Sequence, residues 1–479
     1  MALTTGDLPP DELVTEGRAI LDWIAAYLRE PERYPVLARV RPGDVRRALP
    51  ASPPEHAEAL ETIVRDFETR ILPGVTHWNH PGFFAYFSIS ASVPGILAEL
   101  LIAALNVNGM LWKTSPAATE LEQVALDWLR QLLGMQPGWF GIINDTASIS
   151  TMLALAAARE ARPELAIRER GMAGRADLPT LRVYTSTQAH SSVDKAALAL
   201  GIGLDNVVHI EADEQFRMRA DLLGRAIETD RARGMLPIAC VATVGTTSTT
   251  SIDPVPAIAE ICAREQLWLH VDASYGGAAA VVPEMRRVLD GVERADSLVV
   301  NPHKWLFTPI DCSAFFTRRP DVLRRAFSLV PEYLVTREQD EVENLMDYGV
   351  QLGRRFRALK LWMVIRAFGA EGLADRIRAH CRLAQQFAGW VEADDDWKLM
   401  APVPFSLVCF RYAPAGMSDA DRDRRNEEIL HAVNATGDVF LSHTRLAGRF
   451  TLRLAIGNIR TEQRHVELAW RRLREAAAQ

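Results

Sequence analysis

One lysine stands out because of the residues that surround it. Of the 54 basic residues in the sequence, only five are lysine: Lys113, Lys195, Lys304, Lys360 and Lys398. A desolvated amine can lose its proton and attack a carbonyl group, which a guanidinium effectively cannot do. Lys304 follows the apolar run 297–300 and the turn-forming pair Asn301-Pro302, and residues 305–307 after it are all apolar. We interpret Lys304 as a nucleophile at the end of a buried strand rather than as a surface charge.

Three more polar signals fall where predicted strands end. Residues 146–148 (Thr-Ala-Ser) separate a strand from a helix, and the N-terminus of a helix suits a phosphate. Asp272 ends an apolar strand and is followed by small residues, while His190 comes shortly after another strand. Each has a structural alternative, because Ser, Thr and Asp are common helix caps and a single histidine is often structural.

Together these residues predict pyridoxal phosphate (PLP) as cofactor. A lysine can form a Schiff base with the aldehyde, and an aspartate can keep the ring nitrogen protonated so that the ring accepts electrons from a carbanion. Amides and hydroxyls at residues 146–148 would anchor the phosphate, and the imidazole of His190 would stack on the ring.

The elements that must position these residues form an α/β pattern. Strand and helix signals alternate between residues 141 and 317, and the strands are continuous apolar runs. Such runs are typical of a mostly parallel sheet that helices cover on both faces, with ligands at the carboxyl ends of the strands. Strands are expected at 141–144, 181–186, 237–244, 267–272, 297–300 and 312–317, and helices from about 148, 191 and 255.

The two ends of the chain have different patterns. Residues 11–29 form an amphipathic helix and a second helix is expected over about 55–71, after a proline-rich stretch. A helix capped by Ser115 should run to about Leu133. The C-terminal part reads as a smaller α+β domain with strands at 405–412, at 439–440 and at 451–455. We expect an N-terminal helical arm (1–92) on a partner subunit, a large cofactor-binding domain (93–360) and a small domain (361–479).

Composition limits the class of protein. A net charge of −7 offers no basic surface for nucleic acid, and the longest apolar stretch, near 95–104, is interrupted by Glu99 and too short to span a bilayer. His77 and His80 lack acidic or cysteine partners nearby, so no metal site is expected. The five cysteines show no paired spacing, and the first residues do not read as a secretory signal, so a cytoplasmic enzyme with reduced thiols is expected.

Several segments in one order resemble a known family. The sequence 301–305 (Asn-Pro-His-Lys-Trp), with 270–275 (His-Val-Asp-Ala-Ser-Tyr) upstream, is similar to the group II PLP-dependent decarboxylases, specifically the aromatic-L-amino-acid decarboxylase family. The likeness extends over nearly the whole chain and includes residues 74–81, 115–122, 188–192, 245–247 and 352–357.

The resemblance implies a fold type I homodimer with a mostly parallel, seven-stranded type of central sheet and active sites at the subunit interface. It implies decarboxylation of an L-amino acid of the tryptophan, tyrosine, phenylalanine or DOPA type to the amine and CO2, through a quinonoid carbanion. By this likeness Lys304 is the Schiff-base lysine, Asp272 the pyridinium partner and His190 the stacking residue. The phosphate would be held by Thr146, Ala147, Ser148, Asn301 and His303, and the ring site lined by Thr246 and Ala273.

One departure concerns the fate of the carbanion. Relatives carry a loop tyrosine that is thought to protonate Cα, and Leu345 stands at its place, while Tyr348 matches a tryptophan. Relatives that lack this hydroxyl can give an aldehyde, CO2, ammonia and H2O2. The alternative to a decarboxylase with another proton donor is therefore an aromatic aldehyde synthase.

The substrate pocket carries further departures. Trp78, Tyr86 and Phe87 match the family's aromatic wall. Asn108 and Met110 stand where relatives often place Ile and Phe from the partner subunit, Ile89 stands where Thr is common, and Gly353 matches indole-preferring plant relatives.

Two other readings of the whole chain remain. A fold type I aminotransferase would use Arg453 as a carboxylate clamp, although a solvent-facing strand arginine is the alternative for that residue. A non-enzymatic scaffold would have no use for Lys304.

Overall fold

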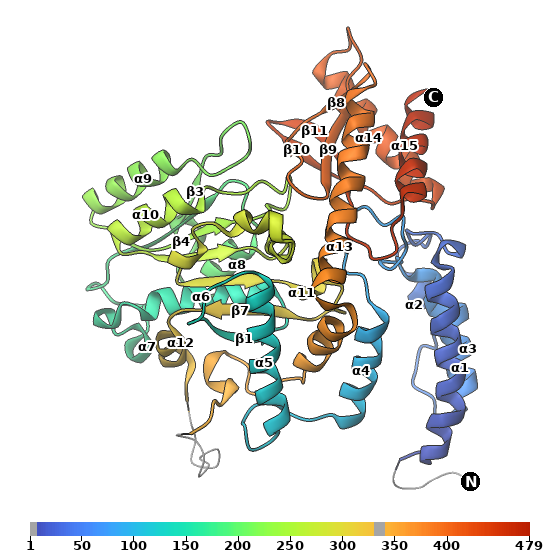
Figure 1. The fold of residues 1–479 in the computed structure, drawn as a ribbon, viewed down its shortest axis with the longest axis horizontal. Helices are drawn as coiled ribbons and strands as arrows, with labels where there is room; N and C mark the ends of the chain where they lie inside the picture. The colour runs from blue at the N-terminus through green and yellow to red at the C-terminus, as the bar shows by residue number, and fades with distance from the viewer. Residues whose placement is uncertain (1–6, 330–340) are drawn as a thin grey trace. The chain divides into compact units, whose positions relative to one another are not determined.

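The computed structural model describes residues 7–329 and 341–479 (Figure 1). The chain forms two compact units. The larger comprises residues 86–410 and 455–459, and the smaller comprises residues 1–85, 411–454 and 460–479. All of the predicted cofactor residues belong to the larger unit. The predicted three-part division of the chain stays a prediction.

The larger unit is built on a seven-stranded sheet in the order β1-β7-β6-β5-β4-β2-β3. Only β7 runs antiparallel to its neighbours β1 and β6, while the remaining neighbours pair in parallel. The predicted mostly parallel sheet of an α/β fold is confirmed. The strands are β1 (Phe140–Asn144), β2 (Leu181–Ser186), β3 (Val207–Ile210), β4 (Leu236–Thr243), β5 (Trp268–Asp272), β6 (Ser297–Val300) and β7 (Ser313–Thr317).

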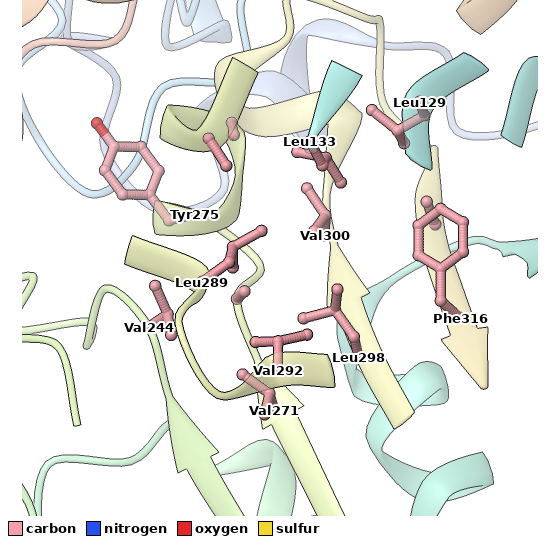
Figure 2. Close-up of a cluster of buried hydrophobic side chains, with 14 of the residues drawn as sticks. Leu129, Leu133, Val244, Val271, Tyr275, Leu289, Val292, Leu298, Val300 and Phe316 are labelled. Carbon is pink, nitrogen blue, oxygen red and sulfur yellow. The ribbon is translucent and has the colours of Figure 1, made fainter. Parts of the chain in front are cut away.

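Helices cover both faces of this sheet. Alternate strand residues enter two separate apolar clusters: Cys240 and Ala242 belong to one, and Ala239 and Val241 to the other. The first cluster joins the sheet to α5 (Pro116–Leu132), α9 (Ala220–Ala232), α10 (Val255–Glu265) and α13 (Ala358–Glu392), and Figure 2 shows part of it. The second joins it to α6 (Ala147–Glu160), α8 (Ser192–Ala199) and α12 (Pro320–Phe327). Two-sided burial explains why the strands are apolar without alternation.

Shorter segments complete the larger unit. Helix α4 (Val93–Leu105) precedes α5, whose predicted cap is confirmed because the Ser115 side chain accepts a hydrogen bond from the Ala118 amide. The remaining elements are α7 (Ile167–Arg170), α11 (Pro302–Trp305), the 3-10 turn Leu345–Tyr348, β8 (Trp397–Leu399) and β9 (Leu407–Tyr412), which begins in this unit.

The smaller unit combines helices with strands. Helix α1 (Pro10–Arg29) matches the predicted amphipathic helix, and β10 (Ser442–Leu446) pairs antiparallel with β11 (Arg449–Ala455). These two strands belong to a four-stranded sheet in the order β10-β11-β9-β8. The other helices are α2 (Asp44–Ala48), α3 (Leu60–Asp66), α14 (Asp419–Thr436) and α15 (Gln463–Ala477).

The sequence misjudged some boundaries. Helix α3 begins at Leu60 rather than near residue 55, and β10 begins at Ser442, after the predicted strand at 439–440. Strand β3 was not expected, because four residues give too short a pattern until β2 supplies a parallel partner. Arg453 is 4% exposed and donates to the Ser442 hydroxyl, so the solvent-facing position expected for it is wrong.

Candidate active site

The predicted cofactor residues lie at one edge of the central sheet. Each follows the carboxyl end of a parallel strand: residues 146–148 follow β1, Asn301 to Lys304 follow β6, Asp272 ends β5, Thr246 follows β4 and His190 follows β2. The sheet order places these strands next to one another, with only the antiparallel β7 intervening. Ligands of open α/β sheets bind at this edge, because the loops there converge.

Lys304 sits on the short helix α11, directly after β6. Proline at the first helical position and Asn301 as the N-cap end the strand and start the turn, so the amine comes out at the sheet edge. Burial lowers the pKa of Lys304, although the Asp272 charge opposes this shift. A lowered pKa raises the fraction of unprotonated amine, which is the form that attacks a carbonyl group.

The two carboxylate oxygens of Asp272 differ in their hydrogen bonds. Its Oδ1 accepts hydrogen bonds from the amide and the hydroxyl of Ser274, and these bonds fix the carboxylate plane. Among the residues that the structure describes, Oδ2 has no hydrogen-bond partner, although Asp272 is only 6% exposed. An available carboxylate oxygen on a largely buried aspartate can face a protonated ring nitrogen.

His303 and Asn301 offer polar groups beside the lysine. The Nδ1 atom of His303 accepts the Cys312 amide at 2.9 Å, so the neutral ring carries its proton on Nε2 and can donate it. Burial lowers the pKa of His303 to about 3, with the Lys304 charge acting in the same direction. The buried Oδ1 of Asn301 has no partner among the described residues, and an asparagine amide can turn to present its NH2 group instead.

The start of α6 lies close to these groups. Ser150 Oγ and Ser313 Oγ are 3.2 Å apart, and Ser313 follows Cys312, the residue bonded to His303. Thr146 is the N-cap of α6 but its side chain does not cap the helix, and its amide donates to Asp145 instead. The free amides of this first turn, His303 and Asn301 together fit a phosphate group.

His190 and Thr246 come from the other side of β5. His190 is exposed in the single chain, but desolvation by the atoms around its ring lowers its pKa. The Asp272 charge opposes this shift and the Lys304 charge adds to it, so all three residues interact electrostatically. Nδ1 of His190 accepts the Ser192 amide at 3.1 Å, which orients the ring. Thr246 is buried and its hydroxyl lies 2.8 Å from that of Ser251, which braces the loop after β4. Ala273 is also buried, and its amide donates to the Val299 carbonyl.

A stack of aromatic rings lies beside the Lys304 amine. The Lys304 amine lies 5.4 Å from the centre of the Phe87 ring, and Phe87 stacks on Tyr275 at 3.9 Å. Tyr275 in turn stacks on Trp305 at 4.7 Å, and the Trp305 indole donates to His380. The predicted pocket residue Phe87 therefore lies beside the lysine.

The other predicted pocket residues divide into separate groups. One group contains Asn108, Met110 and Gly353. The Asn108 side-chain amide is 3.5 Å from the Met110 sulfur, and a Cβ added at Gly353 would lie 3.8 Å from the same amide nitrogen. Met110 also accepts the Met346 amide, next to Leu345. Tyr86 is 53% exposed and Ile89 is half-buried, while Trp78 belongs to the smaller unit and stacks on Phe83.

Leu345 and Tyr348 are both packed in the apolar cluster on the α6 side of the sheet. Leu345 is 2% exposed and Tyr348 is 3% exposed. The Tyr348 hydroxyl donates to Glu343 at 2.5 Å, and burial, together with this carboxylate, raises the pKa of Tyr348. This hydrogen bond engages the Tyr348 hydroxyl with Glu343 rather than with the groups around Lys304 that are described above.

Comparison with known proteins shows the family of the chain. The Pyridoxal-dependent decarboxylase conserved domain matches residues 42–413. The chain belongs to the pyridoxal-dependent decarboxylase family. It is 40% identical to phenylacetaldehyde synthase from Arabidopsis thaliana, over 98% of this chain and 96% of the synthase. It is 41% identical to tyrosine decarboxylase 4 from Petroselinum crispum, over 98% and 94% respectively.

The fold of a solved decarboxylase matches as well. The crystal structure of Oryza sativa TDC with PLP and tryptamine superposes with a TM-score of 0.94 at 37% identity, and the match covers 99% of each chain. The predicted cofactor and fold type I are thereby confirmed, and the enzyme is a PLP-dependent amino-acid decarboxylase by family. No cluster of three or more metal-binding side chains occurs in the described part of the chain. None of the described helices is long and apolar enough to cross a membrane.

Sequence reasoning missed several supporting residues. The sequence assigned no role to Ser274, although an aspartate side chain often accepts a hydrogen bond from the amide two residues later. The stack of Phe87, Tyr275, Trp305 and His380 combines residues from distant segments, so no local pattern could reveal it.

Proposed function

We propose that this enzyme decarboxylates an aromatic L-amino acid to the corresponding amine. The observation that carries the proposal is the Phe87 ring, which lies beside the Lys304 amine on a stack of buried aromatic rings. A flat apolar surface next to the reactive amine favours a flat apolar side chain. The decarboxylases among the similar proteins, with tyrosine and tryptophan in their names, support the same class of substrate.

The residues divide the work by position. Bound PLP supplies an electron sink for the electrons released when CO2 leaves. Asp272 Oδ2 would stabilise positive charge on the ring nitrogen, and the Lys304 amine would hold the cofactor through its aldehyde group. His303, Asn301 and residues 146–148 would hold the phosphate, while His190, Thr246 and Ala273 would confine the ring.

A second candidate is an aromatic aldehyde synthase. It is favoured by Leu345, whose side chain has no proton to donate, and by the engagement of the Tyr348 hydroxyl with Glu343. The similarity to phenylacetaldehyde synthase fits this candidate equally well. The two candidates differ in whether Cα of the decarboxylated substrate receives a proton or reacts with oxygen.

The enzyme is proposed to act as a homodimer with active sites at the interface. Five apolar residues of α4 are between 45% and 58% exposed in the single chain, and their spacing puts them on one face of the helix: Val93, Leu97, Leu100, Leu101 and Leu105. Helix α1 has no buried residue, as expected for an arm that packs on a partner subunit. Light scattering should give twice the chain mass of 53.3 kDa. The free cysteines suit the reducing cytoplasm.

Product analysis tests the proposal. Purified enzyme is incubated with tryptophan, tyrosine, phenylalanine and DOPA separately, and amine, CO2, ammonia and peroxide are measured in the same reaction. Amine equal to CO2 without peroxide is expected, whereas aldehyde with stoichiometric ammonia and peroxide would establish the synthase. Amine transfer that requires a keto acid would identify an aminotransferase. The Lys304→Ala variant should lose all turnover and the borohydride-sensitive visible absorbance, and an unchanged variant would indicate a scaffold.

A further inference from the structure

A second unusual lysine lies behind the active site. Lys360, in the first turn of α13, is 0% exposed, although it carries an amine. Burying an ammonium group is costly unless it is paired and hydrogen-bonded. The chain uses arginine for almost every other basic position, so a buried lysine at this one needs a reason.

Two carboxylates meet this amine. The Lys360 amine donates to Glu99 Oε1 of α4 at 2.5 Å and lies 3.8 Å from Asp311 Oδ1. Arg357 donates two hydrogen bonds of 3.0 Å to the carboxylate of the same Asp311. Arg355 donates to Glu99 at 2.6 Å. Asp311 is thus held between two cations from the start of α13, and its backbone cannot move without breaking charged hydrogen bonds.

The segment of Asp311 and Cys312 makes the hydrogen bond that decides which ring nitrogen of His303 is protonated. Asp311 is followed by Cys312, whose amide donates to His303 Nδ1 and whose carbonyl accepts the His303 amide at 3.3 Å. Because Nδ1 accepts, Nε2 must carry the proton of the neutral ring. The charges of Asp311 and Lys360 both act on the pKa of His303, which shows that they lie within electrostatic reach of the ring.

We infer that Lys360, with Asp311, is a positioning residue for the cofactor phosphate: it fixes the backbone that keeps His303 Nε2 protonated and aimed as a donor. The inference rests on the proposed phosphate role of His303. Lysine suits the place because its compact amine fits between two carboxylates in a fully buried space, where a guanidinium is larger and planar.

The test compares four single variants and one double variant as reconstituted holoenzymes. Lys360→Met and Asp311→Asn should raise the dissociation constant of PLP by about tenfold or more, as expected when a charge-assisted hydrogen bond is weakened. They should also shift the 31P resonance of the bound phosphate, which a purely structural role would leave in place. Asp311→Asn keeps the side-chain shape, so it tests the inference even if Lys360→Met does not fold. Lys398→Met, at an exposed position of β8, is the control and should change neither quantity.

A double-mutant cycle separates this inference from the function on which it rests. If Lys360 acts through His303, adding Lys360→Met to His303→Ala should weaken PLP binding no further than His303→Ala alone. The inference would be overturned if the losses of PLP affinity in the two single variants add up in the double variant. An unshifted 31P resonance in Lys360→Met and Asp311→Asn would also overturn it. If His303→Ala binds PLP as tightly as the unmodified enzyme, then the proposed phosphate role of His303 fails, and the inference fails with it.

Discussion

Gly276 should tolerate no side chain, because two backbone segments of the site touch there. A Cβ added at Gly276 would lie 2.6 Å from the Val244 carbonyl oxygen and 2.9 Å from the Phe405 ring. Val244 also donates its amide to the Asp272 carbonyl, so the segments after β4 and β5 are directly bonded. Gly276→Ala therefore pushes apart the two loops that carry Thr246 and Asp272.

The size of the effect follows from the distances. Ordinary van der Waals contact begins at 3.4 Å, so the segments must separate by about 0.8 Å. Overpacking of this kind costs about 1–3 kcal/mol of folding free energy. A displacement approaching 1 Å at Asp272 should lower kcat/KM by roughly 10- to 100-fold, since catalytic geometry tolerates about 0.5 Å.

The assay pairs this variant with Gly389→Ala. Gly389 lies inside α13 with nothing within 4 Å of its added Cβ, so alanine there should stabilise the helix by up to about 1 kcal/mol and leave kcat/KM unchanged. Thermal unfolding and kcat/KM are measured for both variants under identical conditions. If Gly276→Ala unfolds at or above the temperature of the parent enzyme and keeps full kcat/KM, the close approach of the two loops is not required and the reasoning is refuted.

Three further outcomes are expected. Asp272→Asn should lower kcat by about 10²- to 10³-fold, because an amide cannot hold the ring nitrogen protonated; activity within a few-fold of the parent would remove Asp272 from that role. Tyr348→Phe should cost about 1 kcal/mol of stability through the lost bond to Glu343 and leave the ratio of amine to aldehyde unchanged, whereas a switch of product would identify Tyr348 as the proton donor. Burial lowers the pKa of His380 to about 4, so between pH 6.5 and 4 the unfolded chain binds a proton that the folded chain does not, and stability falls as the pH falls. His380→Phe leaves the Trp305 indole without its acceptor and should lower the free energy of unfolding by about 1–3 kcal/mol near pH 8. Denaturant unfolding should show that this difference between variant and parent shrinks toward pH 4. A difference that grows as the pH falls would contradict the expected direction.

The sequence alone determined the chemistry and the class of fold. Strands buried on both faces are continuous apolar runs, and the residues that follow them must gather at one edge of a parallel sheet. Lys304, Asp272 and His190 could therefore be assigned to one site from the sequence. The rarity of lysine pointed to Lys304 because an amine does chemistry that a guanidinium cannot.

Tertiary structure decided what surrounds these residues. Phe87 stacks on Tyr275, which stacks on Trp305. Asp311 forms ion pairs with Lys360 and Arg357. These contacts join segments that lie far apart in the chain, and no local pattern encodes such pairings. Leu345 shows the same limit: alignment gives its place in a motif, but only packing shows its side chain inside an apolar cluster. Periodicity and residue type are local properties that a sequence displays directly. The protonation state of His303 depends on a hydrogen bond from Cys312 and on nearby charges, which exist only once the chain has folded.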